Sequence, residues 1–227
     1  MTKFPHTKTV RNNMLQIIPN INVTSENDFE KIIEKLPATT ELVQIDIADG
    51  TSTPKKNWHD REQMLNKIPC TIELHIMSTS PRPIISEWLT DEKVKNIIFH
   101  SEGLDQSEII SLAALIRTNG KIPGIAVRPE TPPENLTDII SYFDSILILG
   151  VHPGTAGQTF LPETIEKISL TKKLYPNKLI EADGGISLNN VREINIAGAD
   201  YACAASAIFS TTDPSEALRQ LISTSQI

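Results

Sequence analysis

Two aspartates and a histidine stand where three apolar runs of this chain end. Asp46 closes the run L-V-Q-I-D, His75 closes I-E-L-H, and Asp183 closes L-I-E-A-D. Two carboxylates that face each other across a substrate can take a proton from one face of a carbon and return one to the other face. Carboxylates and an imidazole can also hold a divalent metal ion that stabilises an enediolate. These residue types therefore indicate proton transfer next to a carbonyl group.

Gln44 lies two residues before Asp46, and side chains two apart on a strand point to the same side. A side-chain amide oxygen can act as a metal ligand beside carboxylates and imidazole. The candidate metal ligands are therefore Gln44, Asp46, His75 and Asp183. The identity of the ion is open among Zn, Fe, Mn, Co and Mg.

Small residues follow the last three apolar runs and indicate an anion site. They are Gly154, Thr155, Ala156, Gly157, Gly184, Gly185, Ala205 and Ser206. Backbone N–H groups can approach a phosphate closely where no bulky side chain intervenes. We therefore expect a phosphate to be bound by backbone N–H groups of Gly157, Gly185 and Ser206. A lone Gly-x-x-Gly is more often only a turn, so the prediction depends on the three loops together.

Eight short apolar runs must position these residues. The expected strands are Leu15–Ile21, Leu42–Ile47, Thr71–Met77, Asn96–His100, Ile122–Val127, Ser145–Gly150, Leu179–Asp183 and Tyr201–Cys203. Runs that are apolar on both faces are typical of buried parallel strands. Helical patterns lie between them, at Asp28–Leu36, Pro81–Leu89, Leu112–Arg117, Glu134–Tyr142 and Val191–Ala197, with a last helix opening at Pro214.

Strand–helix alternation repeated eight times predicts an α/β fold, a single (β/α)8 TIM barrel. No G-x-G-x-x-G follows the first run, which disfavours an open dinucleotide-binding sheet. We expect residues 1–227 to form one domain, with a short polar tail at about residues 1–13. In such a barrel the site lies at the C-terminal ends of the strands, where Asp46, His75 and Asp183 stand.

Composition narrows the range of functions. The chain has 227 residues, of which 39% are hydrophobic and 22% charged, as in a soluble globular domain. Its net charge of −7 argues against non-specific nucleic-acid binding. No stretch of 18 apolar residues is present, and the first 13 residues lack the apolar segment of a secretory signal. We expect a cytoplasmic protein without membrane or nucleic-acid partners, in which Cys70 and Cys203 are buried thiols.

Several motifs occur in a specific order along the chain. They are Pro19-Asn20-Ile21, Asp46-Ile47-Ala48-Asp49-Gly50, His75-Ile76-Met77, the run from Val151 to Gln158, Asp183-Gly184-Gly185-Ile186 and Ser206-Ala207-Ile208-Phe209. Together they resemble the ribulose-phosphate 3-epimerase family, from Ile18 to about Pro214. The resemblance implies a metal-dependent isomerase in pentose phosphate metabolism that converts D-ribulose 5-phosphate to D-xylulose 5-phosphate. We also expect it to form a homo-oligomer.

The resemblance also implies roles for individual residues. Asp46 and Asp183 would be the acid/base pair and metal ligands, and His75 would be a further ligand. Met77 would pack beside the enediolate, and Asn20 would contact the substrate. The glycine-containing loops would bind the phosphate.

The chain departs from the family motifs at several positions. Gln44 stands for a histidine ligand, Asn20 for a serine, Thr51 and Thr155 for a histidine and a phenylalanine, and Ala205 for a glycine. Glutamine is a weaker ligand than imidazole for Zn or Fe, so the metal affinity should fall or the preference should move to harder ions.

Two alternatives to the epimerase remain open from the sequence. One is a related barrel enzyme for another sugar phosphate, of the hexulose-phosphate aldolase or epimerase type. The other is a non-catalytic barrel that binds a sugar phosphate, motivated by Gln44. The presence of Asp46, His75 and Asp183 argues for an enzyme, because a decayed site would be free to lose them.

Overall fold

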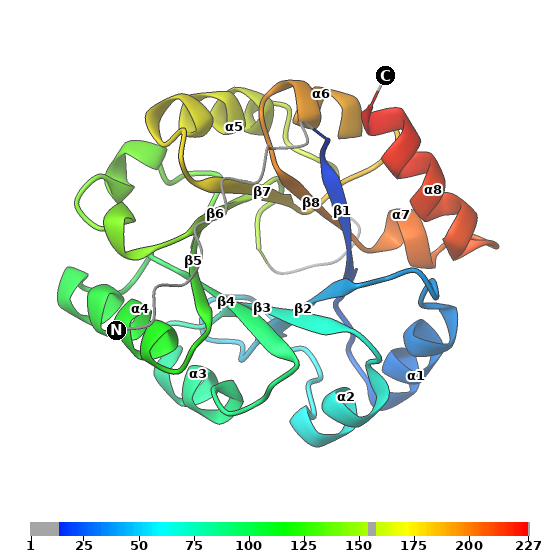
Figure 1. The fold of residues 1–227 in the computed structure, drawn as a ribbon, viewed down its shortest axis with the longest axis horizontal. Helices are drawn as coiled ribbons and strands as arrows, with labels where there is room; N and C mark the ends of the chain where they lie inside the picture. Colours follow the sequence, from blue (N-terminus) through cyan, green and yellow to red (C-terminus); the bar gives the residue numbers. More distant parts are fainter. Residues whose placement is uncertain (1–13, 154–157, 227) are drawn as a thin grey trace.

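A closed barrel of eight parallel strands forms the centre of the molecule (Figure 1). The computed structural model describes residues 14–153 and 158–226. The strands are β1 (Gln16–Ile21), β2 (Leu42–Ala48), β3 (Thr71–Met77), β4 (Val94–His100), β5 (Ile122–Val127), β6 (Ser145–Leu149), β7 (Leu179–Asp183) and β8 (Tyr201–Ala204). They follow one another in chain order around the barrel, and β8 pairs with β1. The predicted TIM barrel is confirmed.

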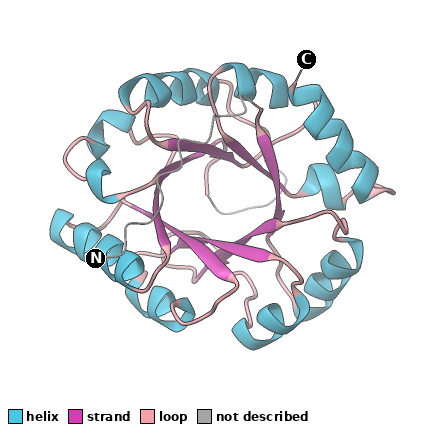
Figure 2. Cartoon of the chain, in the orientation of Figure 1, coloured by secondary structure: helices cyan, strands magenta, loops and turns pink. Residues whose placement is uncertain are grey.

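Helices surround the barrel on its outer side (Figure 2). They are α1 (Glu26–Lys35), α2 (Arg61–Lys67), α3 (Arg82–Trp88), α4 (Gln106–Thr118), α5 (Glu163–Leu174), α6 (Val191–Ile196), α7 (Ser206–Phe209) and α8 (Pro214–Ser225). Local sequence starts several of them, because Ser25, Asp105 and Asp213 each accept a hydrogen bond from a backbone N–H of the first turn. These caps fix the residues at which the helices begin after the preceding strands.

Several helical segments differ from the sequence prediction, including the short α7, which was not expected. The helix expected at Glu134–Tyr142 is two short 3-10 turns, η1 (Pro133–Leu136) and η2 (Ile140–Tyr142). The β-branched residues between and within these turns are weaker helix formers. Helix α2 was not predicted, because Met64 is its only buried residue. Helix α5 was missed because two of its three buried residues are threonines, which hides the apolar period.

The barrel interior has an apolar part and a polar part. Ile98, Ala126, Leu147 and Leu149, from β4 to β6, form a small cluster separate from the main core. The polar part includes buried Asn20, Gln44, Asp46, Glu73, His75, His100, Glu181 and Asp183, from β1 to β4 and β7. The expectation that the strands are apolar on both faces is therefore wrong for β2, β3 and β7, whose inward residues are polar. This asymmetry places the chemistry on one side of the barrel.

Other sequence expectations have mixed outcomes. Cys203 is buried, as expected, but Cys70 stands just before β3 and is only half-buried. The expected tail at residues 1–13 lies outside the described residues. None of the helices within residues 14–153 and 158–226 is long and apolar enough to cross a membrane.

Candidate active site

The C-terminal halves of six strands, β1, β2, β3, β6, β7 and β8, surround a cavity of about 460 Å³. Asp46 on β2 is in register with His75 on β3, and Asp183 is the last residue of β7. Asn20 and Met77 also line the cavity, from β1 and β3. The barrel thus brings together the residues that the sequence predicted to meet.

The two carboxylates are connected through the side chains between them. His75 Nδ1 lies 3.2 Å from Asp46 Oδ1 and 3.2 Å from Asp183 Oδ2. Asn20 Nδ2 donates to Asp46 Oδ2 and Asp183 Oδ1, both at 3.2 Å. All four side chains are at least nine-tenths buried. The carboxylates therefore act as one anionic site, closed off from water on most sides.

Gln44 donates hydrogen bonds to both carboxylates. Its Nε2 donates to Asp46 Oδ1 at 2.9 Å and to Asp183 Oδ2 at 3.1 Å. Its Oε1 accepts a hydrogen bond from Cys203 Sγ at 3.0 Å, which gives the amide its direction. Coordination of a metal by Gln44 would require the amide to rotate and present Oε1 instead. The ligand role of Gln44 stays a prediction.

Burial and mutual repulsion shape the protonation of the site. Burial raises the pKa of Asp46, and the nearby Asp183 raises it further. Burial alone would lower the pKa of His75, but its contacts with Asp183 and Asp46 outweigh it and raise the pKa to about 10. A protonated His75 therefore balances the carboxylates where no other cation is present.

The same three groups suit a divalent cation. One ligand atom from each of Asp46, His75 and Asp183 lies within 4.8 Å of the others. A cation between them would replace the proton that His75 carries and relieve the repulsion between the carboxylates. The donor set of two carboxylates and an imidazole fits a divalent ion.

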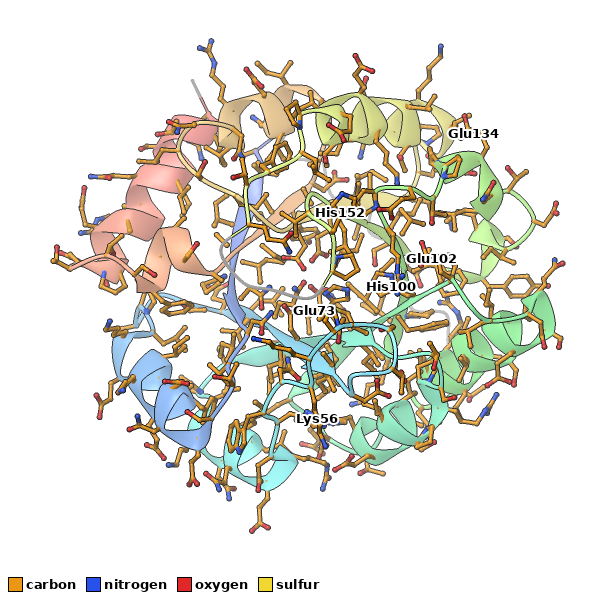
Figure 3. The ribbon with its side chains drawn as sticks, turned by 180° about the vertical axis from the view of Figure 1, so that it is seen from behind. Lys56, Glu73, His100, Glu102, Glu134 and His152 are labelled. Atoms are coloured by element: carbon orange, nitrogen blue, oxygen red, sulfur yellow. The ribbon has the colours of Figure 1, made fainter. Side chains whose placement is uncertain are left out.

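A second buried acidic group lies one layer deeper in the barrel. Glu73, Glu181 and Cys203 approach one another within 4.8 Å (Glu73 is labelled in Figure 3). Burial raises the pKa of Glu73 and of Glu181, and it raises the pKa of the Cys203 thiol. Cys203 Sγ lies 2.8 Å from Glu181 Oε1 and 3.0 Å from Gln44 Oε1, and its one hydrogen can be donated to either of them. These groups connect the floor of the site to Gln44.

The expected phosphate side is partly described. Gly184, Gly185, Ala205 and Ser206 line the cavity. Gly184 and Gly185 have φ of 95° and 70°, which favours glycine. A Cβ on Gly185 would lie 2.7 Å from Phe160 N, so the glycine is required by packing as well. The predicted residues Gly154, Thr155, Ala156 and Gly157 lie outside the described residues.

Sequence reasoning missed several residues of the site. Asn22 Nδ2 donates to Asp46 Oδ2 at 2.8 Å, and its position two residues after Asn20 in N-I-N was the available signal. Asn57 accepts a hydrogen bond from the backbone N–H of Ala48 at 2.8 Å, which braces the end of β2. Further lining residues come from the loops after β1 and β2: Thr24, Thr53, Lys55 and Lys56. Their spacing along the sequence follows no pattern, so only the folded structure shows that they line the cavity.

This fold and this site define a class of protein: (β/α)8-barrel enzymes that act at the C-terminal mouth of the barrel. Comparison with solved structures agrees with the fold. The chain superposes on the tryptophan synthase α-subunit from Pyrococcus furiosus with a TM-score of 0.67 at 14% identity, covering 95% of this chain and 98% of that chain. For orotidine 5'-phosphate decarboxylase from Pyrococcus horikoshii the TM-score is 0.64 at 14% identity, covering 93% and 100%. These likenesses concern the fold alone.

Sequence comparison identifies the family. The model of the ribulose-phosphate 3 epimerase family matches residues 16–209. Ribulose-phosphate 3-epimerase from Mycobacterium leprae is 30% identical over 86% of this chain and 89% of its own length. The enzyme of the same name from Escherichia coli is 30% identical over 81% and 84%. The chain belongs to the ribulose-phosphate 3-epimerase family and is an isomerase, as the resemblance of its motifs implied.

Proposed function

We propose that the chain interconverts D-ribulose 5-phosphate and D-xylulose 5-phosphate by moving the proton at C3. The observation that carries this proposal is the buried pair Asp46 and Asp183, joined through Asn20, Gln44 and His75 in one cavity. Family membership supports the substrate class.

Inversion at C3 requires two groups in opposite protonation states. One carboxylate takes the C3 proton, and the electron pair of the C–H bond moves toward the C2 carbonyl to form an enediolate. The other carboxyl group, protonated at the start, delivers its proton to the opposite face of C3. The raised pKa of Asp46, caused by burial and by the nearby Asp183, supports Asp46 as a carboxyl group that can carry a proton. Either aspartate begins the reaction, depending on the direction.

The proposed cofactor is a divalent metal ion held by Asp46, His75 and Asp183. When bound, it would stabilise the negative charge that develops on the substrate oxygens. Asn20 and Gln44 orient the carboxylates, since each donates to both of them. Asn20 Oδ1 is buried with no hydrogen-bond partner in the described part of the chain, which suits a substrate hydroxyl donor.

We propose that the remaining cavity residues bind the substrate away from C3. The phosphate would lie against Gly184, Gly185, Ala205 and Ser206. Met77 is buried and lines the cavity beside His75, which supports an apolar contact with the reacting carbons. A ketose phosphate would thus have its anion at one side and C3 at the carboxylates.

The test is solvent-deuterium incorporation at C3 of D-ribulose 5-phosphate, followed by NMR with the metal-loaded protein. We expect deuterium to enter with formation of D-xylulose 5-phosphate. The assay is run with Zn, Fe, Mn, Co and Mg in turn, and with related ketose phosphates. If no substrate in this set exchanges its proton with any ion, the proposal is wrong.

Two properties of the whole protein are also proposed. We propose that it self-associates, because Leu170 and Leu174 on α5 and Ile196 on α6 are exposed apolar residues and Ile196 is 74% exposed. Sedimentation equilibrium that gives the mass of one chain would contradict this. We propose a cytoplasmic location, supported by a relative from Oryza sativa whose name specifies a cytoplasmic isoform. Cell fractionation tests it.

A further inference from the structure

The second ring nitrogen of His75 faces another histidine. His75 Nε2 lies 3.0 Å from His100 Nε2, and His100 is the last residue of β4. Their relative exposures are 0% and 2%, so neither nitrogen can exchange this contact for water. The His75 side chain thus has the carboxylates on its Nδ1 side and a histidine on its Nε2 side.

Glu102 determines which nitrogen of His100 carries hydrogen. Its Oε2 lies 3.1 Å from His100 Nδ1 (both residues are labelled in Figure 3). Its Oε1 accepts from the backbone N–H of Arg128 at 2.8 Å and from the Thr131 hydroxyl. Burial alone would raise the pKa of Glu102, but His100 and the other donors outweigh it and lower the pKa to about 2. A carboxylate only accepts, so His100 Nδ1 must be the donor.

The direction of the hydrogen bond between His75 and His100 follows from this. Two nitrogens 3.0 Å apart can hold only one hydrogen between them. His100 is 2% exposed and directs its Nδ1 hydrogen to Glu102, so the neutral ring has a lone pair on Nε2. His75 Nε2 must then donate. A neutral His75 consequently carries its lone pair on Nδ1, which is the nitrogen that faces Asp46 and Asp183.

We infer that His100 and Glu102 are positioning residues that hold His75 in the tautomer whose Nδ1 lone pair is aimed at the space between Asp46 and Asp183. This inference rests on the metal role proposed above, because that lone pair is what a cation would bind. An imidazole ligand generally donates its other N–H to a partner that sets its tautomer and orientation. Here the partner is His100, and the carboxylate of Glu102 sets the direction of both hydrogen bonds.

Glu102 also accepts hydrogen bonds from Arg128 and Thr131 and so holds neighbouring loops in place. Loss of activity in a variant would therefore not by itself establish that Glu102 positions His75. The first test therefore uses the wild-type protein without turnover. Nitrogen-15 NMR of labelled histidines reports which ring nitrogens carry hydrogen, in the metal-free and in the zinc-loaded protein. In both samples we expect His100 with hydrogen on Nδ1 and none on Nε2, and His75 with hydrogen on Nε2. His75 Nδ1 should also carry hydrogen in the metal-free protein and lose it when zinc binds. Hydrogen on His100 Nε2 would overturn the inference.

The second test replaces Glu102, the last residue in this series of hydrogen bonds. In Glu102→Gln the new amide can donate to His100 Nδ1, which lets His100 Nε2 donate and moves the hydrogen of His75 to Nδ1. We expect zinc affinity, measured by competition with a chromophoric chelator, to fall by about 10–100-fold. Glu108→Gln is the matched control, because Glu108 pairs with Arg82 near the start of α4, away from the cavity lining.

The outcomes separate this inference from the proposed function. Wild-type zinc affinity in Glu102→Gln, with unchanged histidine tautomers, would overturn the inference. If the wild type binds no divalent ion, the metal role fails, but the spectrum of the metal-free protein still decides the tautomer of His100. If Glu102→Gln does not fold, the wild-type spectra alone decide.

Discussion

Asp46 and Asp183 contact the same three nitrogen atoms at closely matching distances. Asn20 Nδ2 lies 3.2 Å from each carboxylate, and so does His75 Nδ1. Gln44 Nε2 lies 2.9 Å from Asp46 and 3.1 Å from Asp183. These shared contacts distinguish the carboxylates little, which suits a proton transfer that runs in both directions.

Replacing one aspartate should separate proton exchange from inversion. Asp183→Asn leaves Asp46 able to take and return a proton on one face of C3 only. We expect epimerisation to slow by at least about 10²-fold, because a general acid–base group is lost. Deuterium should still enter one epimer, and Asp46→Asn should exchange the other epimer. Asp144→Asn, on the exposed pair with Arg117, is the control and should behave as wild type.

Gln44→His tests whether position 44 can supply a metal ligand. The imidazole offers a lone pair in place of an amide that donates to both carboxylates. We expect the metal Kd to fall about tenfold, which is about 1.4 kcal/mol of extra stabilisation at saturating metal. The metal-free variant should unfold more easily, by about 1–3 kcal/mol, because Asp46 and Cys203 lose a partner. Gln220→His, exposed on α8, controls for added histidine, and an unchanged Kd at position 44 would refute the prediction.

The hydrogen bonds that Glu102 accepts from His100, Arg128 and Thr131 should make stability depend on pH in the acid range. The pKa of Glu102 is lowered from 4.5 to about 2 in the folded protein. Its contribution is therefore complete above about pH 4.5 and is lost as the pH falls toward 2. The difference in free energy of unfolding between wild type and Glu102→Gln should shrink over this range by at most about 3 kcal/mol. Urea denaturation at several pH values measures it, and a constant difference would contradict the assignment.

We expect Gly185 to be needed for stability of the fold as well as for binding of the substrate phosphate. Gly185→Ala places a Cβ 2.7 Å from Phe160 N at a φ of 70°. Gly120→Ala is a matched control, since Gly120 has a φ of 75° and nothing within 4 Å of its Cβ position. We expect Gly120→Ala to cost about 1–2 kcal/mol of unfolding free energy from backbone strain alone. Gly185→Ala should cost clearly more in thermal or urea denaturation, and equal costs would show that the loop adjusts.

Local sequence determined the strands and the positions of the main catalytic candidates. Buried parallel strands carry apolar runs, so all eight strands were predicted within a few residues of their observed ends. Asp46, His75 and Asp183 could be placed at one mouth because strand C-termini of a barrel meet there. Helices such as α2 could not be predicted, because a helix with one buried residue has no apolar period.

Only the tertiary structure decided how these residues act on one another. His100 was not among the site residues predicted from the sequence, yet it contacts His75. Gln44 was expected to be a ligand, yet its amide donates to both aspartates. Such contacts depend on strand register, closure of the barrel and side-chain rotation. These are settled by long-range packing, in which residues far apart in the chain compete for the same buried hydrogen-bond partners. The residue types of the site are therefore readable along the chain, but the direction of each hydrogen bond is a property of the closed barrel.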